Sequence, residues 1–127
     1  MSLRSPLGAV LGLGAAGHGV THWWQQRLTA TALLVLGPWL LISLARLDGL
    51  DRAHLIEWLR AGLTAPVLIL LVIAVAWHSK LGVQVIIEDY VHGRSKLALL
   101  VVTSFLHILL AVSAIHAILR ISLAGAP

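Results

Sequence analysis

The chain has 127 residues, of which 59% are hydrophobic and only 11% are charged, whereas charged residues make up about 25% of an ordinary soluble domain, so this composition is typical of a membrane protein. The formal charge is +4, but the nine Lys and Arg residues are scattered along the chain, which argues against the basic stripe of a nucleic-acid-binding protein. Because the chain has no cysteine, it supplies neither a disulfide nor a thiolate ligand, and any metal must be held by histidine or by a partner.

Residues 1–27 are predicted to form an N-terminal interfacial segment. Its apolar stretch SPLGAVLGLGAAGHG follows Arg4 but has no clear cleavage site, so we do not expect a secretory signal. The first membrane span is predicted over residues 28–45, because about 20 mainly apolar residues are needed to cross a hydrocarbon core about 30 Å thick. Gly37 and Pro38 lie inside it, and the proline predicts a kink because it removes one backbone hydrogen bond.

A short amphipathic helix is predicted between the first and second spans. In ARLDGLDRAHLIEWLRAGL, apolar residues alternate with charged ones. Such a pattern is typical of a helix that lies in the membrane interface, with Trp58 at the level of the lipid headgroups. The apolar residues are Leu55, Ile56, Trp58 and Leu59, and the charged ones are Asp51, Arg52, Glu57 and Arg60.

The second and third spans are predicted over residues 65–87 and 97–121, and residues 122–127 form a C-terminal tail. Thr64 is a plausible N-cap for the second span, and Pro66 falls in the first turn, where a missing N–H costs little. Each span must be a helix, because irregular backbone facing lipid would leave polar groups unpaired. The predicted fold is therefore an all-α membrane protein with three transmembrane helices in one domain, residues 28–121.

The stretch HSKLGVQVIIEDYVH places ionisable groups inside and just after the second span. Such groups are rare in membranes and usually mark a cofactor, a pathway or a partner. His78 lies near mid-membrane, and a neutral imidazole can bind haem iron without cysteine. Asp89, eleven positions later, returns to within about 20° of the same helix face. Gly82 lies on this stripe and would let a flat ring approach, although close helix packing is its alternative role.

Three neighbouring groups complete the candidate set. Tyr90 is either an ordinary interfacial residue or a hydrogen-bond donor to a carbonyl of a lipid-soluble substrate. Lys80 lies about 200° from His78 in projection, so it points away from any ring bound there. His107 lies about 15 Å into the third span, at nearly the depth of His78, so spacing alone permits a haem held by two histidines of this chain.

The pattern H-x-x-x-G-x-x-x-x-x-x-D-Y-V resembles the second transmembrane helix of the small hydrophobic membrane anchor, of the D type, in succinate dehydrogenase (respiratory complex II). The matching residues are His78, Gly82, Asp89, Tyr90 and Val91. VIIEDYVH resembles the alphaproteobacterial and mitochondrial-type version, and THWWQQRLTATALL resembles the segment of that family that leads into the first span. The resemblance covers most of the chain from about residue 17.

The resemblance implies that His78 is an axial ligand of haem b, wedged between this chain and a second membrane anchor, of the C type. The second ligand would come from that partner rather than from His107. Gly82 would lie beside the haem, and Arg27 matches an arginine near the haem propionates, a role that suits a bidentate guanidinium. His22 either joins Arg27 there or is an ordinary interfacial histidine.

The resemblance also implies a substrate and partners. Tyr90 would hydrogen-bond a carbonyl of ubiquinone, and Asp89 would support the polar network around it. FAD and the iron–sulphur clusters would reside on a flavoprotein subunit and an iron–sulphur subunit, so this chain alone would hold no complete active site. The expected location is the bacterial inner membrane, or the mitochondrial inner membrane in a eukaryote.

Orientation and function both retain alternatives at this point. The basic residues barely favour one side, but Arg94 and Lys96 in a very short loop favour an N-terminus in the cytoplasm. One alternative function is the anchor of a fumarate reductase, which runs the reaction in reverse. The other is a non-redox transporter subunit, in which His78, Lys80 and Asp89 form a proton relay.

Overall fold

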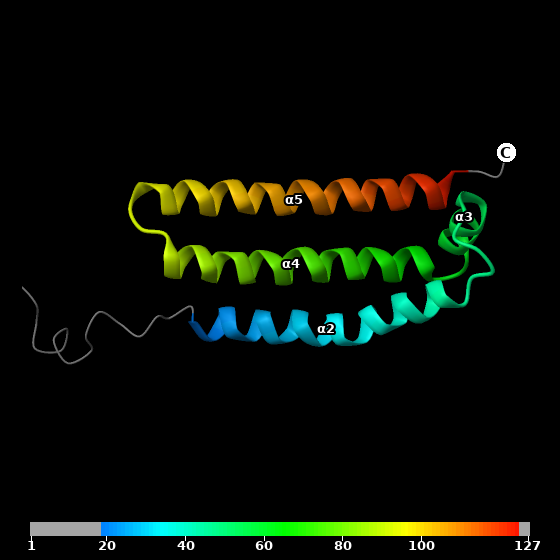
Figure 1. Ribbon diagram of the computed structural model, residues 1–127, viewed down its shortest axis with the longest axis horizontal. Helices are drawn as coiled ribbons and strands as arrows, with labels where there is room; N and C mark the ends of the chain where they lie inside the picture. Colours follow the sequence, from blue (N-terminus) through cyan, green and yellow to red (C-terminus); the bar gives the residue numbers. More distant parts are fainter. Residues whose placement is uncertain (1–18, 125–127) are drawn as a thin grey trace, which may run out of the picture.

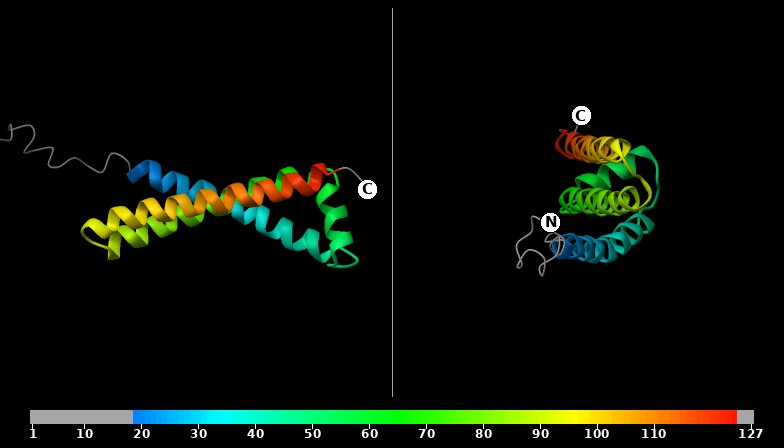
Figure 2. Two further views of the ribbon diagram at one scale, coloured as in Figure 1. Left: turned by 90° about the horizontal axis from the view of Figure 1, so that it is seen from above. Right: turned by 90° about the vertical axis from the view of Figure 1, so that its left-hand side faces the viewer.

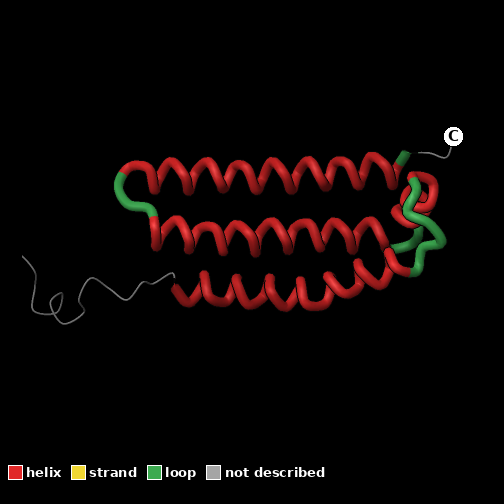
Figure 3. The backbone as a smooth tube through the Cα atoms, viewed as in Figure 1, coloured by secondary structure: helices red, strands yellow, loops and turns green. Residues whose placement is uncertain are grey.

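The computed structural model describes residues 19–124, and these fold into four helices joined by short connections (Figure 3). The helices are α2 (Gly19–Ala45), α3 (Arg52–Arg60), α4 (Thr64–Tyr90) and α5 (Arg94–Leu123). Helices α2, α4 and α5 are long and apolar enough to cross a membrane, and the short α3 lies between the first two. The predicted fold class, with three spans and one short intervening helix, is confirmed.

The three long helices form one layer with α4 in the middle (Figure 1). Helix α4 packs against both neighbours, whereas among the described residues α2 and α5 make no packing contact with each other. Figure 2 shows that α2 crosses the α4–α5 pair at an angle, while α3 closes one end of the layer. The helix that bears the candidate residues between His78 and Tyr90 is therefore the central one.

The long helices extend beyond the predicted spans. Helix α2 begins at Gly19, so residues 19–27 are helical and continuous with the first span, although the sequence placed them in the interfacial segment. The rest of that segment, residues 1–18, lies outside the described residues, as do residues 125–127 of the predicted tail. Hydropathy marks only the part of a helix in hydrocarbon, whereas the backbone hydrogen bonds that define the helix continue into the polar interface.

Two local predictions about the helices have different outcomes. Pro38 lies within α2, which stays continuous and bends in the half that contains the proline (Figure 1). The prediction that Thr64 is an N-cap is wrong. Thr64 is already the first residue of α4, the cap position belongs to Leu63, and no side chain caps the helix. The Thr64 N–H instead bonds the carbonyl of Ala61 at 3.0 Å, in the tight turn after α3.

Helix α3 is tied to all three long helices. Leu59 is buried against Ala65 of α4 and Ile118 of α5. The Trp58 ring stacks on Trp39 of α2 with centroids 6.4 Å apart. In addition, the Arg60 Nε donates to the Ile121 carbonyl of α5 at 3.2 Å, which satisfies a carbonyl in the last turn of α5. These contacts fix one end of the layer.

Most of the large apolar side chains on the long helices are exposed. In water this exposure would be costly, but lipid tails are as apolar as the side chains themselves, so a helix in a bilayer need not bury them. The layer therefore has two broad faces that are suited to lipid or to other transmembrane helices.

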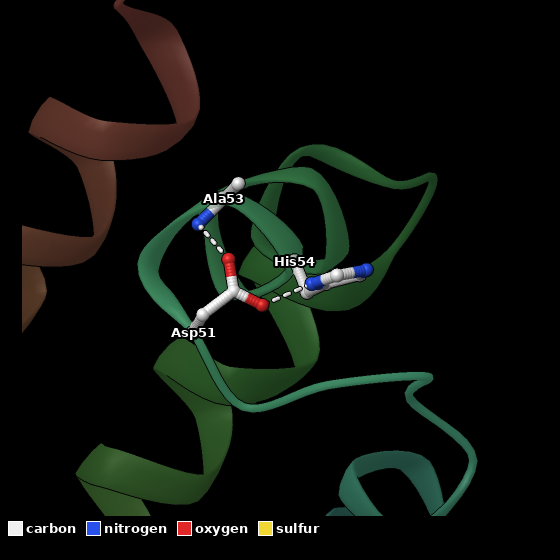
Figure 4. A network of polar contacts seen from close by, with 3 residues as sticks. All are labelled: Asp51, Ala53 and His54. Atoms are coloured by element: carbon white, nitrogen blue, oxygen red, sulfur yellow. Dashed lines mark hydrogen bonds and ion pairs between the residues drawn. The ribbon is translucent and has the colours of Figure 1, made fainter.

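The start of α3 is organised by Asp51, which the sequence pattern marked only as one charge of an amphipathic helix. Its carboxylate accepts from the Ala53 N–H at 3.1 Å and pairs with the His54 Nδ1 (Figure 4). A Cβ on Gly49 would approach this carboxylate to 2.9 Å, so the glycine leaves room for the pair. The hydrogen bond with His54 lowers the pKa of Asp51, and the same bond raises the pKa of His54.

These two pKa shifts predict a pH window for the α3 cap. The stabilisation from Asp51 is present above its ordinary pKa of 3.8 and is lost as pH falls through its lowered pKa. The stabilisation from His54 is complete below its ordinary pKa of 6.5 and is lost as pH rises through its raised pKa. The interaction that caps α3 is therefore most stabilising between pH 3.8 and pH 6.5.

We expect NMR titration of the His54 ring to give a pKa above the ordinary 6.5. Asp51→Asn should lower that pKa by more than Asp48→Asn does, because Asp51 supplies the hydrogen bond whereas Asp48 acts only through its more distant charge. A pKa for His54 at or below 6.5, or equal responses to the two substitutions, would contradict the assignment.

Candidate functional site

His78 forms a hydrogen bond with the neighbouring helix. The imidazole is half-buried on α4, and its Nδ1 lies 3.0 Å from the Thr29 Oγ1 of α2. The Thr29 hydroxyl also lies 2.9 Å from the Gln25 carbonyl and 3.2 Å from the Gln26 carbonyl of its own helix. No hydrogen bond from another described residue reaches the second ring nitrogen of His78, Nε2, which leaves that atom available to an external ligand.

Gly82 lies one turn after His78 and faces open space. A Cβ built on it would meet no atom within 4 Å, so close packing against the described residues of this chain does not explain the glycine. Haem is a flat ring with iron at its centre. On each face it needs room for the ring and a side chain that can bind the iron, and His78 and Gly82 meet both needs on one face. The described residues of this chain therefore fit half of a haem site.

His107 differs from His78 in that both of its ring nitrogens are satisfied within the chain. Its Nδ1 lies 2.7 Å from the Thr103 carbonyl, and a carbonyl only accepts, so this nitrogen carries the hydrogen. Its Nε2 lies 3.1 Å from the Ser79 Oγ and accepts from that hydroxyl. The structure links His78 to α2 and His107 to α4.

Asp89 and Tyr90 lie at the end of α4, remote from His78. Both are exposed, with Tyr90 80% exposed, and the helical rise from His78 to Tyr90 is about 18 Å. Their neighbour Glu88 instead accepts from the Gln84 amide at 2.8 Å. The structure thus places the Asp89 carboxylate and the Tyr90 phenol at the C-terminal end of α4, exposed rather than enclosed by the described part of this chain.

Arg27 and His22 are on different sides of α2. The Arg27 side chain is exposed, and its guanidinium lies 5.4 Å from the centroid of the Trp23 ring. His22 is half-buried, and its Nε2 is buried without a hydrogen-bond partner among the described residues. Five positions on a helix correspond to about 140°, so the structure does not bring the two side chains together.

A groove with a volume of about 560 Å³ is lined by residues of α2, α4 and α5 but not by His78, and we call it the α4 groove. Lys80, which lies about 200° from His78 in projection, lines this groove together with His22 and His107. The only ion pair among the described residues is at α3, so none of them supplies a carboxylate to Lys80. Six polar residues line the groove: Thr21, His22, Gln25, Lys80, Gln84 and His107.

Comparison with known proteins gives consistent matches over the chain. Residues 1–119 match a family model described as the succinate dehydrogenase/fumarate reductase transmembrane subunit. No solved structure matches significantly. Residues 1–119 include every position of the His78–Tyr90 stripe.

Individual relatives carry matching names. A succinate dehydrogenase hydrophobic membrane anchor subunit from Paracoccus denitrificans is 30% identical over 97% of this chain and 95% of its own length. One from Rickettsia bellii is 36% identical over 61% of this chain and 62% of its own. A succinate dehydrogenase membrane anchor subunit from Reclinomonas americana is 34% identical over 60% of this chain and 66% of its own.

Proposed function

The chain belongs to the family of succinate dehydrogenase/fumarate reductase transmembrane subunits, and from this premise we propose that it anchors a succinate dehydrogenase in the membrane and helps to form the site of ubiquinone reduction. The observation that carries the site-level proposal is the arrangement along α4. An imidazole with one nitrogen tethered and the other free lies near the middle of α4, and an exposed phenol and carboxylate lie at the end of the same helix.

His78 is the proposed axial ligand of haem b in this chain, through Nε2. The second ligand comes from the C-type membrane anchor, because both nitrogens of His107 already have partners. When bound, the haem would supply a one-electron carrier inside the membrane. Gly82 leaves the wall beside His78 open. Arg27 is the proposed partner of the haem propionates, and the placement of His22 on another side of α2 favours a separate role for that histidine.

Tyr90 and Asp89 are the proposed contribution of this chain to quinone reduction. The Tyr90 hydroxyl would donate a hydrogen bond to one carbonyl oxygen of ubiquinone, which fixes the ring and stabilises negative charge on that oxygen as electrons arrive from the partner subunits. Reduction to the quinol also requires two protons. Asp89, exposed beside Tyr90, is suited to relay them from water to the carbonyl oxygen.

The remaining chemistry belongs to other subunits. A flavoprotein subunit with FAD would oxidise succinate, and an iron–sulphur subunit would pass the electrons on, since this chain has no cysteine for a cluster. The broad exposed faces of the helical layer suit contacts with the second anchor and with lipid. We also propose the bacterial inner membrane, with the N-terminus in the cytoplasm, as the location of this multi-pass protein.

The relay alternative finds no support in the structure. Lys80 lies in the α4 groove, which His78 does not line, and Asp89 is about 16 Å along the helix from His78. Among the described residues no hydrogen bond joins any two of these three side chains. The fumarate reductase alternative concerns the physiological direction, which depends on the quinone and the partner centres.

Purification of the chain in mild detergent from its native membrane tests the function. We expect a flavoprotein, an iron–sulphur protein and a second small hydrophobic anchor to co-purify with the chain. The purified complex should show a b-type absorption band and reduce ubiquinone with electrons from succinate. A colourless homo-oligomer would contradict the proposal. A complex that reduces fumarate with quinol much faster than it reduces ubiquinone with succinate would assign the reverse direction.

A further inference from the structure

We propose that Thr29 is a positioning residue for His78, whose hydroxyl holds the imidazole in the tautomer that leaves Nε2 free for iron. This inference rests on the proposed function, because it takes His78 as the haem ligand. Neither the family resemblance nor the helical spacing assigned a role to Thr29. Its role emerges from a contact between side chains that are 49 positions apart.

The hydrogen positions follow from a count of donors around the Thr29 hydroxyl. Three possible partners surround Oγ1: the carbonyls of Gln25 and Gln26, at 2.9 and 3.2 Å, and the His78 Nδ1, at 3.0 Å. A hydroxyl has one hydrogen, and carbonyl oxygens only accept. If that hydrogen pointed at His78, the hydroxyl oxygen would face two carbonyl oxygens without a hydrogen between them.

The alternative satisfies every group. The hydroxyl donates to the Gln25 carbonyl and accepts from the Nδ1–H of His78, so the lone pair of the neutral ring is on Nε2. A ligand histidine needs this tautomer, and its second nitrogen is normally held by a neighbouring acceptor that fixes the ring orientation. Thr29 supplies that acceptor from α2, and its own orientation is fixed by the carbonyl of the preceding turn.

The hydrogen bond between Thr29 and His78 also joins α2 to α4, so the test must separate an effect on helix packing from an effect on the haem ligand. Among the described residues it is the only hydrogen bond recorded between α2 and α4, so its loss could alter helix packing as well as the ligand. Thr31 offers a matched control on the same helix. Its hydroxyl bonds the carbonyl four residues earlier, Arg27, at 2.9 Å, but it has no hydrogen bond to a histidine.

The experiment compares Thr29→Val, Thr29→Ser and Thr31→Val in the purified complex. Valine keeps the shape of threonine without the hydroxyl, so Thr29→Val should weaken haem retention about 10- to 100-fold, the usual cost of losing such a partner. The haem reduction potential should rise, because an imidazole whose Nδ1–H has lost its acceptor is less basic and stabilises oxidised iron less. Thr29→Ser keeps the hydroxyl, so its haem retention and reduction potential should match those of the wild type. Thr31→Val should also leave both properties unchanged.

Several outcomes overturn the inference. One is a wild-type potential and low-spin electron paramagnetic resonance signal in Thr29→Val. A second is a change in Thr29→Ser as large as in Thr29→Val. If Thr29→Val and Thr29→Ala both fail to assemble while Thr29→Ser assembles, the hydroxyl serves helix packing, which also overturns it. His78→Ala separates the two proposals. If that variant retains haem, His78 is not the ligand. If it loses haem while Thr29→Val behaves like the wild type, only the role of Thr29 is refuted.

Discussion

Replacing His78 with alanine is expected to abolish the low-spin b-type haem spectrum of the purified complex, while replacing His107 with alanine leaves it intact. The two histidines are at similar depth, but only His78 has a ring nitrogen without a partner among the described residues. The His107 Nδ1 donates to the Thr103 carbonyl, and its Nε2 accepts from Ser79. An iron ligand taken from His107 would have to break that second contact.

The effect of His78→Ala should exceed the 10- to 100-fold loss expected for a residue that only supports a ligand, because it removes the ligand itself. Absorption and electron paramagnetic resonance spectra of the assembled complex give the result, with flavin content as the measure of assembly. Loss of the spectrum in His107→Ala, with all subunits present, would show that the chain supplies its ligand from α5 and would refute the partner-supplied ligand.

Replacing Tyr90 with phenylalanine is expected to lower ubiquinone reduction by about 10- to 100-fold, which corresponds to about 1.4 to 2.7 kcal/mol of transition-state stabilisation. The phenol ring is 80% exposed in this chain, so removal of its hydroxyl disturbs no packing among the described residues. The loss should therefore appear in catalysis and not in the assembly or the thermal stability of the complex.

Two controls make the Tyr90 result specific. Succinate oxidation with a soluble artificial electron acceptor bypasses the quinone and should be unchanged in Tyr90→Phe. His92→Gln alters another exposed side chain, two residues after Tyr90, and should retain most of the quinone activity. Full ubiquinone reductase activity in an assembled Tyr90→Phe complex would remove the phenol from its proposed role.

Much of the fold could be predicted because a bilayer constrains a chain so strongly. Apolar runs of the required length must be helices, so the three spans and the amphipathic α3 follow from composition and pattern. The ends of the helices did not follow. Helix α2 extends back to Gly19, and Thr64 is inside α4 rather than at its cap, because local hydrogen bonding sets helix ends and hydropathy does not report it.

The candidate site was predictable where it lies along one helix. The angular spacing of His78, Gly82 and Asp89 depends only on the geometry of α4, and the same residues carried the resemblance to the anchor family. Helical spacing also placed Lys80 on another side of α4, and in the structure Lys80 lines the α4 groove, which His78 does not.

The relations between helices were decided only by the tertiary structure. The way α2 packs on α4 determines that Thr29 reaches His78. The way α5 packs on α4 determines that Ser79 hydrogen-bonds the Nε2 of His107. In a bilayer, apolar faces are nearly interchangeable, because lipid and protein solvate them alike. Hydrophobic pattern and helical spacing therefore determined that the helices exist and which residues share a stripe. Packing and a few hydrogen bonds between helices decided that His78 keeps a ring nitrogen without a partner among the described residues, whereas His107 does not.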